Sequence, residues 1–177
     1  AGGELGLAEE IELGVTWWDT TCVSANIHYP VDWVLLRDAS RTLIKAIMVI
    51  RRHGLRRRIP EPAELLGEMN SLCIAMTQSG RVKDSRRRRK KIVRRMCKLV
   101  DRIGSHGRRY ADLLEERWQE TELSEGQARV IIERLRGMLD KLPEARRQAR
   151  ERIIGERLVP NEEKVLSVYE LVDVLGQ

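Results

Sequence analysis

The sequence contains no phenylalanine, and aromatic residues of any kind make up only 4% of its 177 residues. A buried core must therefore be assembled from Leu, Ile, Val, Met and Ala. Long apolar runs are also missing, since no 18 consecutive residues are apolar, and this excludes a membrane-spanning helix. Residues 1–14 carry four glutamates and no basic residue, so we expect an ill-ordered lead there rather than a signal peptide.

Cysteine is scarce, with only Cys22, Cys73 and Cys97, an odd and widely spaced set without a CxxC pair. This pattern excludes a disulfide framework and argues against a cysteine metal site. It is typical of a reducing compartment, so we expect a cytoplasmic location. A GxxxxGK[ST] phosphate loop is absent as well, and no local Ser/His/Asp or Cys/His motif supports nucleophilic catalysis.

Charge, by contrast, is abundant and segregated. Residues 81–109 hold fourteen Lys and Arg against two Asp, a local balance of +12, and the whole chain is +6, so the remainder carries −6. Such a segment is usually a solvated helix face, but six consecutive cations favour the binding of a polyanion through its phosphates. The predicted DNA-binding residues are Arg86, Arg87, Arg88, Arg89, Lys90, Lys91, Arg94, Arg95 and Lys98.

Helical spacing of apolar residues dominates the middle of the chain. We expect a helix that is N-capped by Asp32 and ends near Gly54, and a second that starts after Pro62. The second helix should be interrupted at Gly80, and a third should begin near Asp84.

Glycine and proline predict further breaks. The "IGSHG" stretch should break or kink the third helix, and a fourth would then run through Tyr110 to Trp118. Ser124 is placed to N-cap the next helix, and Pro143 should start another charged segment.

Two segments are expected to be strands, residues 15–25 and, less clearly, 163–172, because both are rich in β-branched or alternating apolar residues. The order strand, helices, strand fits a helical insertion between two strands of a sheet, or an antiparallel helical bundle with extended ends. We expect the first arrangement, a mostly α fold with a short β component. The helical part would cover about residues 32–158, and the two strands should pair.

Asp19 lies in the middle of the first expected strand, where a carboxylate is unfavourable unless it is exposed, paired or bound to a cation. An exposed strand carboxylate is the simplest interpretation. One carboxylate alone cannot hold a pair of catalytic Mg²⁺ ions, which requires further acidic ligands.

Two sequence blocks carry a family resemblance. "WWDTTCVSANIHYPVDWVLLRDASRTL" resembles the first catalytic-aspartate strand of DDE transposases from bacterial insertion sequences, although Val31 replaces the usual Thr. "RLVPNEEKVLSVYE" is similar to the segment by which these enzymes return from a helical region to an RNase H-like sheet. The positions that match in the first block are Asp19, Thr20, Thr21, Asn26, Ile27, His28, Tyr29, Pro30, Asp32, Leu35 and Leu36.

The resemblance implies that residues 15–177 form part of a transposase catalytic domain and that Asp19 is its first catalytic and Mg²⁺-binding carboxylate. The second Asp and the Glu of the triad have no counterpart here, because Asp173 stands in a different context. The chain therefore resembles a transposase truncated at both ends, and we expect no strand transfer from it alone.

Alternative functions remain open at this point. The chain is either a DNA-binding transposase fragment or a stand-alone basic helical module for nucleic-acid binding or oligomerisation. A small active nuclease fits the incomplete acidic set least well. DNA is the expected partner, no membrane is expected, and a homo-oligomer or a mixed assembly with an intact transposase is left open.

Overall fold

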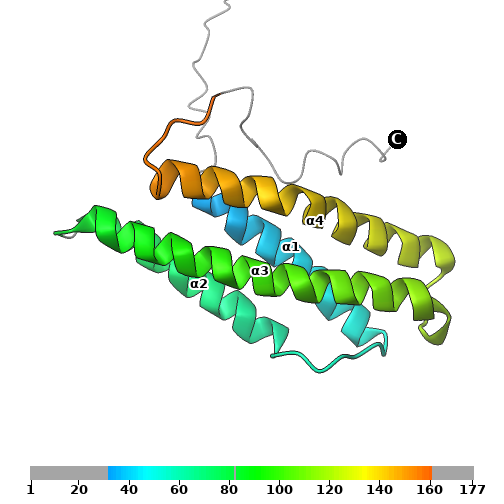
Figure 1. Cartoon of the computed structure of the whole chain (residues 1–177). Helices are drawn as coiled ribbons and strands as arrows, with labels where there is room; N and C mark the ends of the chain where they lie inside the picture. The colour runs from blue at the N-terminus through cyan, green and yellow to red at the C-terminus, as the bar shows by residue number, and fades with distance from the viewer. Residues whose placement is uncertain (1–31, 82, 161–177) are drawn as a thin grey trace, which may run out of the picture.

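The computed structural model describes residues 32–81 and 83–160, and 83% of these residues are helical. Four helices run back and forth as an antiparallel bundle (Figure 1). They are α1 (Asp32–Arg52), α2 (Pro62–Gln78), α3 (Ser85–Arg117) and α4 (Glu125–Ile153). Two short 3-10 turns, η1 (Ser79–Arg81) and η2 (Trp118–Glu120), follow α2 and α3.

The predicted fold, a helical insertion flanked by two strands of an incomplete RNase H-like sheet, is wrong for this part of the chain, which contains helices and no strand. The reason is that each helix buries its apolar stripe against another helix of the bundle, so none needs a sheet to cover it. The lead at 1–14, the expected strands at 15–25 and 163–172 and Asp19 all lie outside the described residues.

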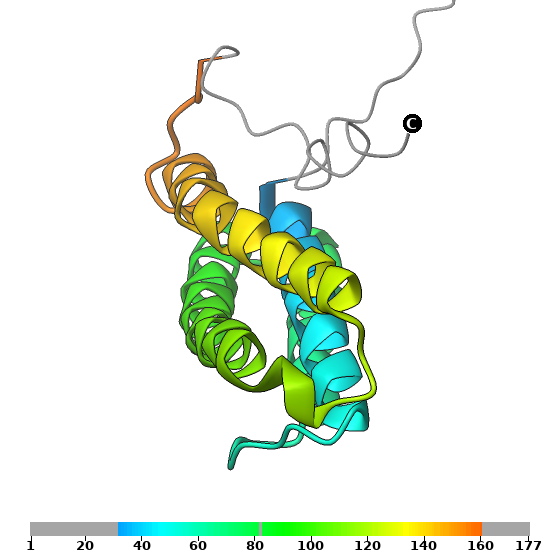
Figure 2. The same cartoon turned by 90° about the vertical axis from the view of Figure 1, so that its right-hand side faces the viewer.

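Helix α1, like α3, packs against all three other helices, whereas α2 and α4 do not touch within the described residues. Its buried positions follow helical spacing over a wide face, so it can serve three neighbours at once. The view along the bundle shows α4 resting over α1 and α3 (Figure 2). The fully buried side chains of α1 include Leu35, Leu36, Leu43, Ile44, Ile47 and Ile50.

The third helix is continuous over 33 residues, so the predicted break at "IGSHG" and the separate fourth helix are both wrong. Gly104 and Gly107 are buried in it and face α4. A Cβ added at Gly104 would lie 3.0 Å from Leu142, and one at Gly107 would lie 3.4 Å from Leu139. These glycines therefore let two helices approach closely rather than ending one of them.

A second correction concerns Pro143, which lies inside α4 instead of starting a new segment. A proline within a helix costs about 3 kcal/mol. The helix continues because the turns on both sides of it are anchored, with Leu142 and Ala145 buried in the core. Burial of the Leu142 side chain alone is worth about 1.5–3 kcal/mol, which offsets much of this cost.

The start of α4 is as predicted. The Ser124 hydroxyl accepts a hydrogen bond from the Gln127 backbone N–H at 3.2 Å, and the Gln127 side chain accepts one from the Ser124 N–H at 2.9 Å. This reciprocal pair is a capping box. Asp32 differs from its prediction as an N-cap, because it is the first residue of α1 and its carboxylate bonds to α4.

Candidate nucleic-acid interface

The outward face of α3 carries a line of cations at steps of three, four and seven residues, which places them on one side of a helix. We call this line the basic seam. All of its members are exposed, and they alternate along the chain with buried core residues such as Val93 and Met96. The members of the basic seam are Arg88, Lys91, Arg95, Lys98, Arg102 and Arg109.

The continuity of α3 gives the basic seam its length. From Arg88 to Arg109 the rise of an α-helix, 1.5 Å per residue, amounts to roughly 32 Å. A helix broken at "IGSHG", residues 103–107, would have left Arg109 on a different element from the rest of the seam. The continuous helix therefore carries the line of cations three turns beyond Lys98, the last of the predicted DNA-binding residues.

Most of the basic seam has no acidic partner within residues 32–81 and 83–160. Its one ion pair there joins Arg102 to Glu68 of α2, at 3.8 Å between exposed side chains. Exposed pairs of this kind contribute about 0–1 kcal/mol. The remaining cations project from a rigid helix toward solvent, where they are free to contact an anionic surface.

The nine residues predicted to bind DNA do not share one surface. Four of them, Arg88, Lys91, Arg95 and Lys98, belong to the basic seam. Arg87 and Arg94 lie on the flank toward α4, because Asp101, seven residues after Arg94, forms an ion pair with Arg146 of that helix.

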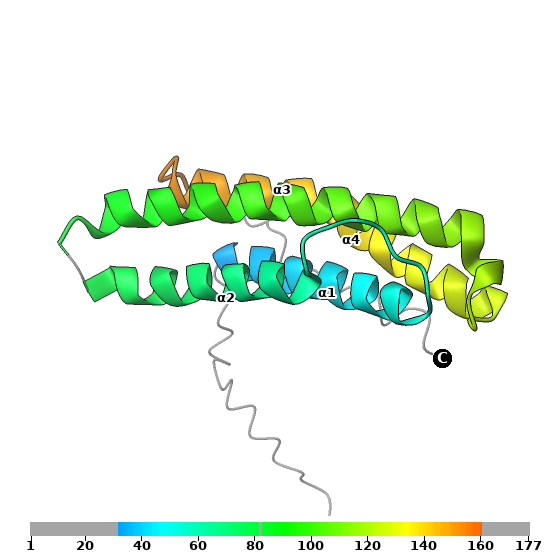
Figure 3. The ribbon, with the colours of Figure 1, turned by 90° about the horizontal axis from the view of Figure 1, so that it is seen from below.

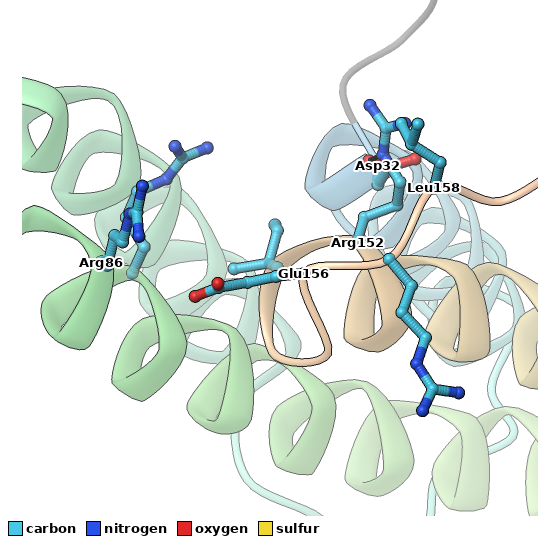
Figure 4. Close-up of a pocket in the computed structure, with 8 residues that line it drawn as sticks. Asp32, Arg86, Arg152, Glu156 and Leu158 are labelled. Carbon is cyan, nitrogen blue, oxygen red and sulfur yellow. Dashed lines mark hydrogen bonds and ion pairs between the residues drawn. The ribbon is translucent and has the colours of Figure 1, made fainter.

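The other three predicted residues turn toward the end of α4. Lys90 forms an ion pair with Glu156 at 2.7 Å. Arg86 and Arg89 line a groove of about 440 Å³ together with the segment that follows α4. Figure 4 shows the Glu156 carboxylate in this groove, directed toward α3 and Arg86.

The groove is basic, but a carboxylate of the chain already occupies it. The hydrogen bond from Lys90, the charge of Lys90 and the nearby Arg86 hold the pKa of Glu156 below its usual value. Glu156 also has a backbone φ of 55°, in the left-handed region that non-glycine residues seldom adopt. The groove thus serves to fasten the end of α4 to the start of α3.

Asp32 closes the far side of the groove through structural contacts. Its buried carboxylate accepts hydrogen bonds from Gln148 Nε2 at 2.8 Å and from Arg152 Nε at 3.0 Å. No group of three or more His, Cys, Asp or Glu residues that could hold a metal ion occurs in the described part of the chain. The residues seen here therefore do not form an Mg²⁺ site, and Asp19, the predicted ligand, is not among them.

The first turns of α3 are electrostatically unfavourable for a helix. This end holds no acidic residue, and Asp84 precedes it with a φ of 65° and no side-chain cap. Cations near a helix N-terminus oppose the helix dipole, at about 0.3–1 kcal/mol each. The basic residues therefore do not stabilise the helix that carries them, which favours a role in binding.

His106 lies beside the basic seam without adding to its charge. Burial lowers its pKa, and the neighbouring charges of Arg109 and Arg102 lower it further. A histidine with a pKa below the ordinary 6.5 is mostly neutral at pH 7.

Two sets of basic residues were missed in the sequence. One is the distal part of the basic seam, Arg102 and Arg109, which continue the seven-residue spacing of Arg88 and Arg95, and this spacing was the available signal. The other is the run Arg56–Arg58 in the connection between α1 and α2, which was interpreted only as a break between helices.

Comparison with known proteins finds no matching family model, no similar curated protein and no similar solved structure. Among the described helices, none has the length and apolar character needed to cross a membrane.

Proposed function

We propose that this helical bundle binds duplex DNA through its phosphates, with the basic seam of α3 as the main contact surface. The observation that carries the proposal is the seam itself, six exposed cations on one face of one helix over roughly 32 Å. A long helix that needed only to be solvated would interleave acidic residues with these cations.

Binding would be driven by release of the counterions condensed on DNA. If all six seam cations reach phosphates, the slope of log K against log salt is roughly −5, at about −0.9 per contact. Specific recognition of bases is not expected, because no base-reading motif accompanies the seam and phosphate contacts carry no sequence information. Affinity should then vary little between unrelated duplexes.

Two blocks of sequence further support a proposal that the chain is a fragment of a DDE transposase, with DNA as its natural partner. These are the Asp-Thr-Thr and Asn-Ile-His-Tyr-Pro block around Asp19 and the "VPNEEKVLS" block after α4. The bundle neither requires nor contradicts this origin. A single carboxylate does not organise two metal ions, so the chain alone should not cleave or join DNA.

The phosphate contacts can be tested by titrating the wild-type chain and Lys98→Gln against two unrelated 24-bp duplexes at several salt concentrations. We expect the substitution to weaken binding equally on both duplexes and to make the slope shallower by roughly one. A flat salt dependence of the wild type, or an effect of Lys98→Gln on one duplex only, would contradict the proposal.

The matched control is Arg134→Gln, which removes the same charge from α4. Arg134 is exposed on α4. The basic seam lies on the side of α3 toward α2, since Arg102 pairs with Glu68 of α2, and α2 and α4 do not touch within the described residues. The control should bind DNA nearly as the wild type does.

The transposase proposal is tested separately, by incubating the chain with supercoiled DNA and Mg²⁺ or Mn²⁺. No nicking or joining is expected. Nicking that disappears in Asp19→Ala would overturn the interpretation as an inactive fragment and support a nuclease.

A further inference from the structure

The connection between α1 and α2 carries three consecutive arginines, Arg56, Arg57 and Arg58, which we call the arginine triad. All three are exposed. None forms an ion pair with any other residue that the structure describes. Three adjacent unpaired cations in a nine-residue connection repel one another, so their clustering does not stabilise the bundle.

The backbone of this connection is held firmly although its arginines are exposed. The Tyr110 hydroxyl of α3 accepts a hydrogen bond from the Arg57 N–H at 3.0 Å and donates one to the Arg57 carbonyl oxygen at 3.4 Å. Tyr110 is completely buried, Leu55 is buried in the core, and Ile59 packs against it. The triad is thus presented on an anchored backbone with apolar residues on either side.

Tyr110 also fixes where the triad lies. It directly follows Arg109, the last member of the basic seam, so the triad is placed at that end of the seam. Figure 3 shows the connection leaving α1 and passing beside α3 before α2 begins. The anchor therefore joins two cationic clusters that are about fifty residues apart in the sequence.

We propose that the arginine triad is a second phosphate-contacting element, held in register with the basic seam by Tyr110. This inference rests on the DNA binding proposed above and extends it. The seam spans roughly 32 Å, close to the 34–36 Å of one turn of B-DNA. Phosphates that face the protein recur at this interval, so the triad contacts the duplex about one turn away from the Arg88 end.

Two consequences follow from this arrangement. Removal of the triad should reduce the number of counterions released on binding. The reduction should be larger on a long duplex than on one too short to reach both ends of the seam. Tyr110 should act as a positioning residue, since loss of its hydroxyl alters the salt dependence of binding without any change in charge.

The experiment measures salt-dependent affinity for a 24-bp duplex and for an 8-bp hairpin. The test variant is Arg56→Gln/Arg57→Gln/Arg58→Gln. Its matched control is Arg41→Gln/Arg129→Gln/Arg134→Gln, which removes three exposed cations of α1 and α4. On the 24-bp duplex the triad variant should have a slope shallower by roughly two to three, and the control by less than one.

On the 8-bp hairpin the triad variant and its control should differ much less. Equal effects of both triples on the 24-bp duplex would overturn the inference, as would a triad effect of the same size on both DNAs. A seam variant, Arg95→Gln/Lys98→Gln, distinguishes failure of the proposed DNA binding from failure of the inference about the triad. If it binds as the wild type does, the proposed function fails; if it weakens binding while the triad variant matches its control, only the inference about the triad fails.

Tyr110→Phe supplies the positioning test, because it keeps the buried ring and every charge. We expect a slope shallower by roughly one on the 24-bp duplex and little change on the hairpin, with unchanged helical circular dichroism at the assay temperature. An unchanged slope in a folded variant would show that the anchor does not position the triad. If the variant fails to fold, the arginine triple still decides the inference.

Discussion

The two longest helices, α3 and α4, lie against each other but differ in how many of their cations form ion pairs. Five of the eight cations of α4 have a carboxylate partner among the described residues, whereas three of the thirteen in α3 do. The first turn of α4 also has a capping box and Glu125, while that of α3 has neither acid nor side-chain cap.

The difference shows that a helix of this bundle can be long and basic while most of its cations have carboxylate partners. In α4, Arg147 is bonded to Glu144 and Glu151 of the same helix. The unpaired cations of the basic seam are thus not a requirement of the fold, which agrees with the proposed contact to an external anion.

The largest effect should come from reversing charge on the two helices in turn. Arg95→Glu/Lys98→Glu removes two phosphate contacts and adds two repulsive charges, so we expect about a 100-fold or greater loss of affinity for duplex DNA near 0.1 M salt. Arg129→Glu/Arg134→Glu makes the same charge change on α4 and should cost far less. Equal losses in a fluorescence anisotropy titration would show that only net charge matters.

A structural contact of α4 should matter for stability instead of binding. Asp32→Ala removes the acceptor of bonds from Gln148 and Arg152, so the free energy of unfolding should fall by about 2 kcal/mol. Asp38→Ala, which removes an ion pair with the adjacent and more exposed Arg37, should cost less than about 0.5 kcal/mol. Urea denaturation followed by circular dichroism measures both, and similar losses would argue against a structural role for Asp32.

The start of α3 offers a substitution with opposite effects on folding and binding. Arg87→Glu places an acid in the first turn of the helix, four residues before Lys91. It should raise the free energy of unfolding by about 0.5 kcal/mol through the helix dipole and the new pair. The same variant should bind DNA more weakly. A loss of stability would show that Arg87 supports the fold.

The smallest effect concerns glycines within the two helices. Gly137→Ala in α4 meets no atom within 4 Å, so helix propensity should raise stability by up to about 1 kcal/mol. Gly104→Ala in α3 gains the same propensity but presses on Leu142 at 3.0 Å, so its net change should be near zero or negative. Thermal denaturation compares the two, and an equal gain would show that Leu142 moves aside freely.

The sequence was informative where local chemistry decides the structure. The end of α1 near Gly54, the start of α2 at Pro62 and the Ser124 cap all follow from residues next to them in the chain. The errors arose where a tertiary contact overrides a local signal. A glycine such as Gly104 disfavours a helix in isolation, but here it leaves room for Leu142 of α4. Pro143 stays within a helix because Leu142 and Ala145 on either side of it are buried.

The candidate site follows the same division. Six consecutive cations were visible in the sequence, but their distribution over three surfaces depends on which way α3 faces its neighbours. The hydrogen bond between Arg57 and Tyr110 joins residues that are 53 positions apart, and no local sequence pattern predicts it. Asp19, the predicted catalytic residue, lies outside the described residues.

The bonds from Asp32 to Gln148 and Arg152 have a topological consequence. They join the first turn of α1 to the last turns of α4 across 116 and 120 positions of sequence, so the chain enters and leaves the bundle at neighbouring points. A unit with adjacent entry and exit can be grafted into a surface loop of another protein, or circularly permuted, without separating its helices. Asp32 thus holds together the two ends of a helical unit that can be transplanted as a whole.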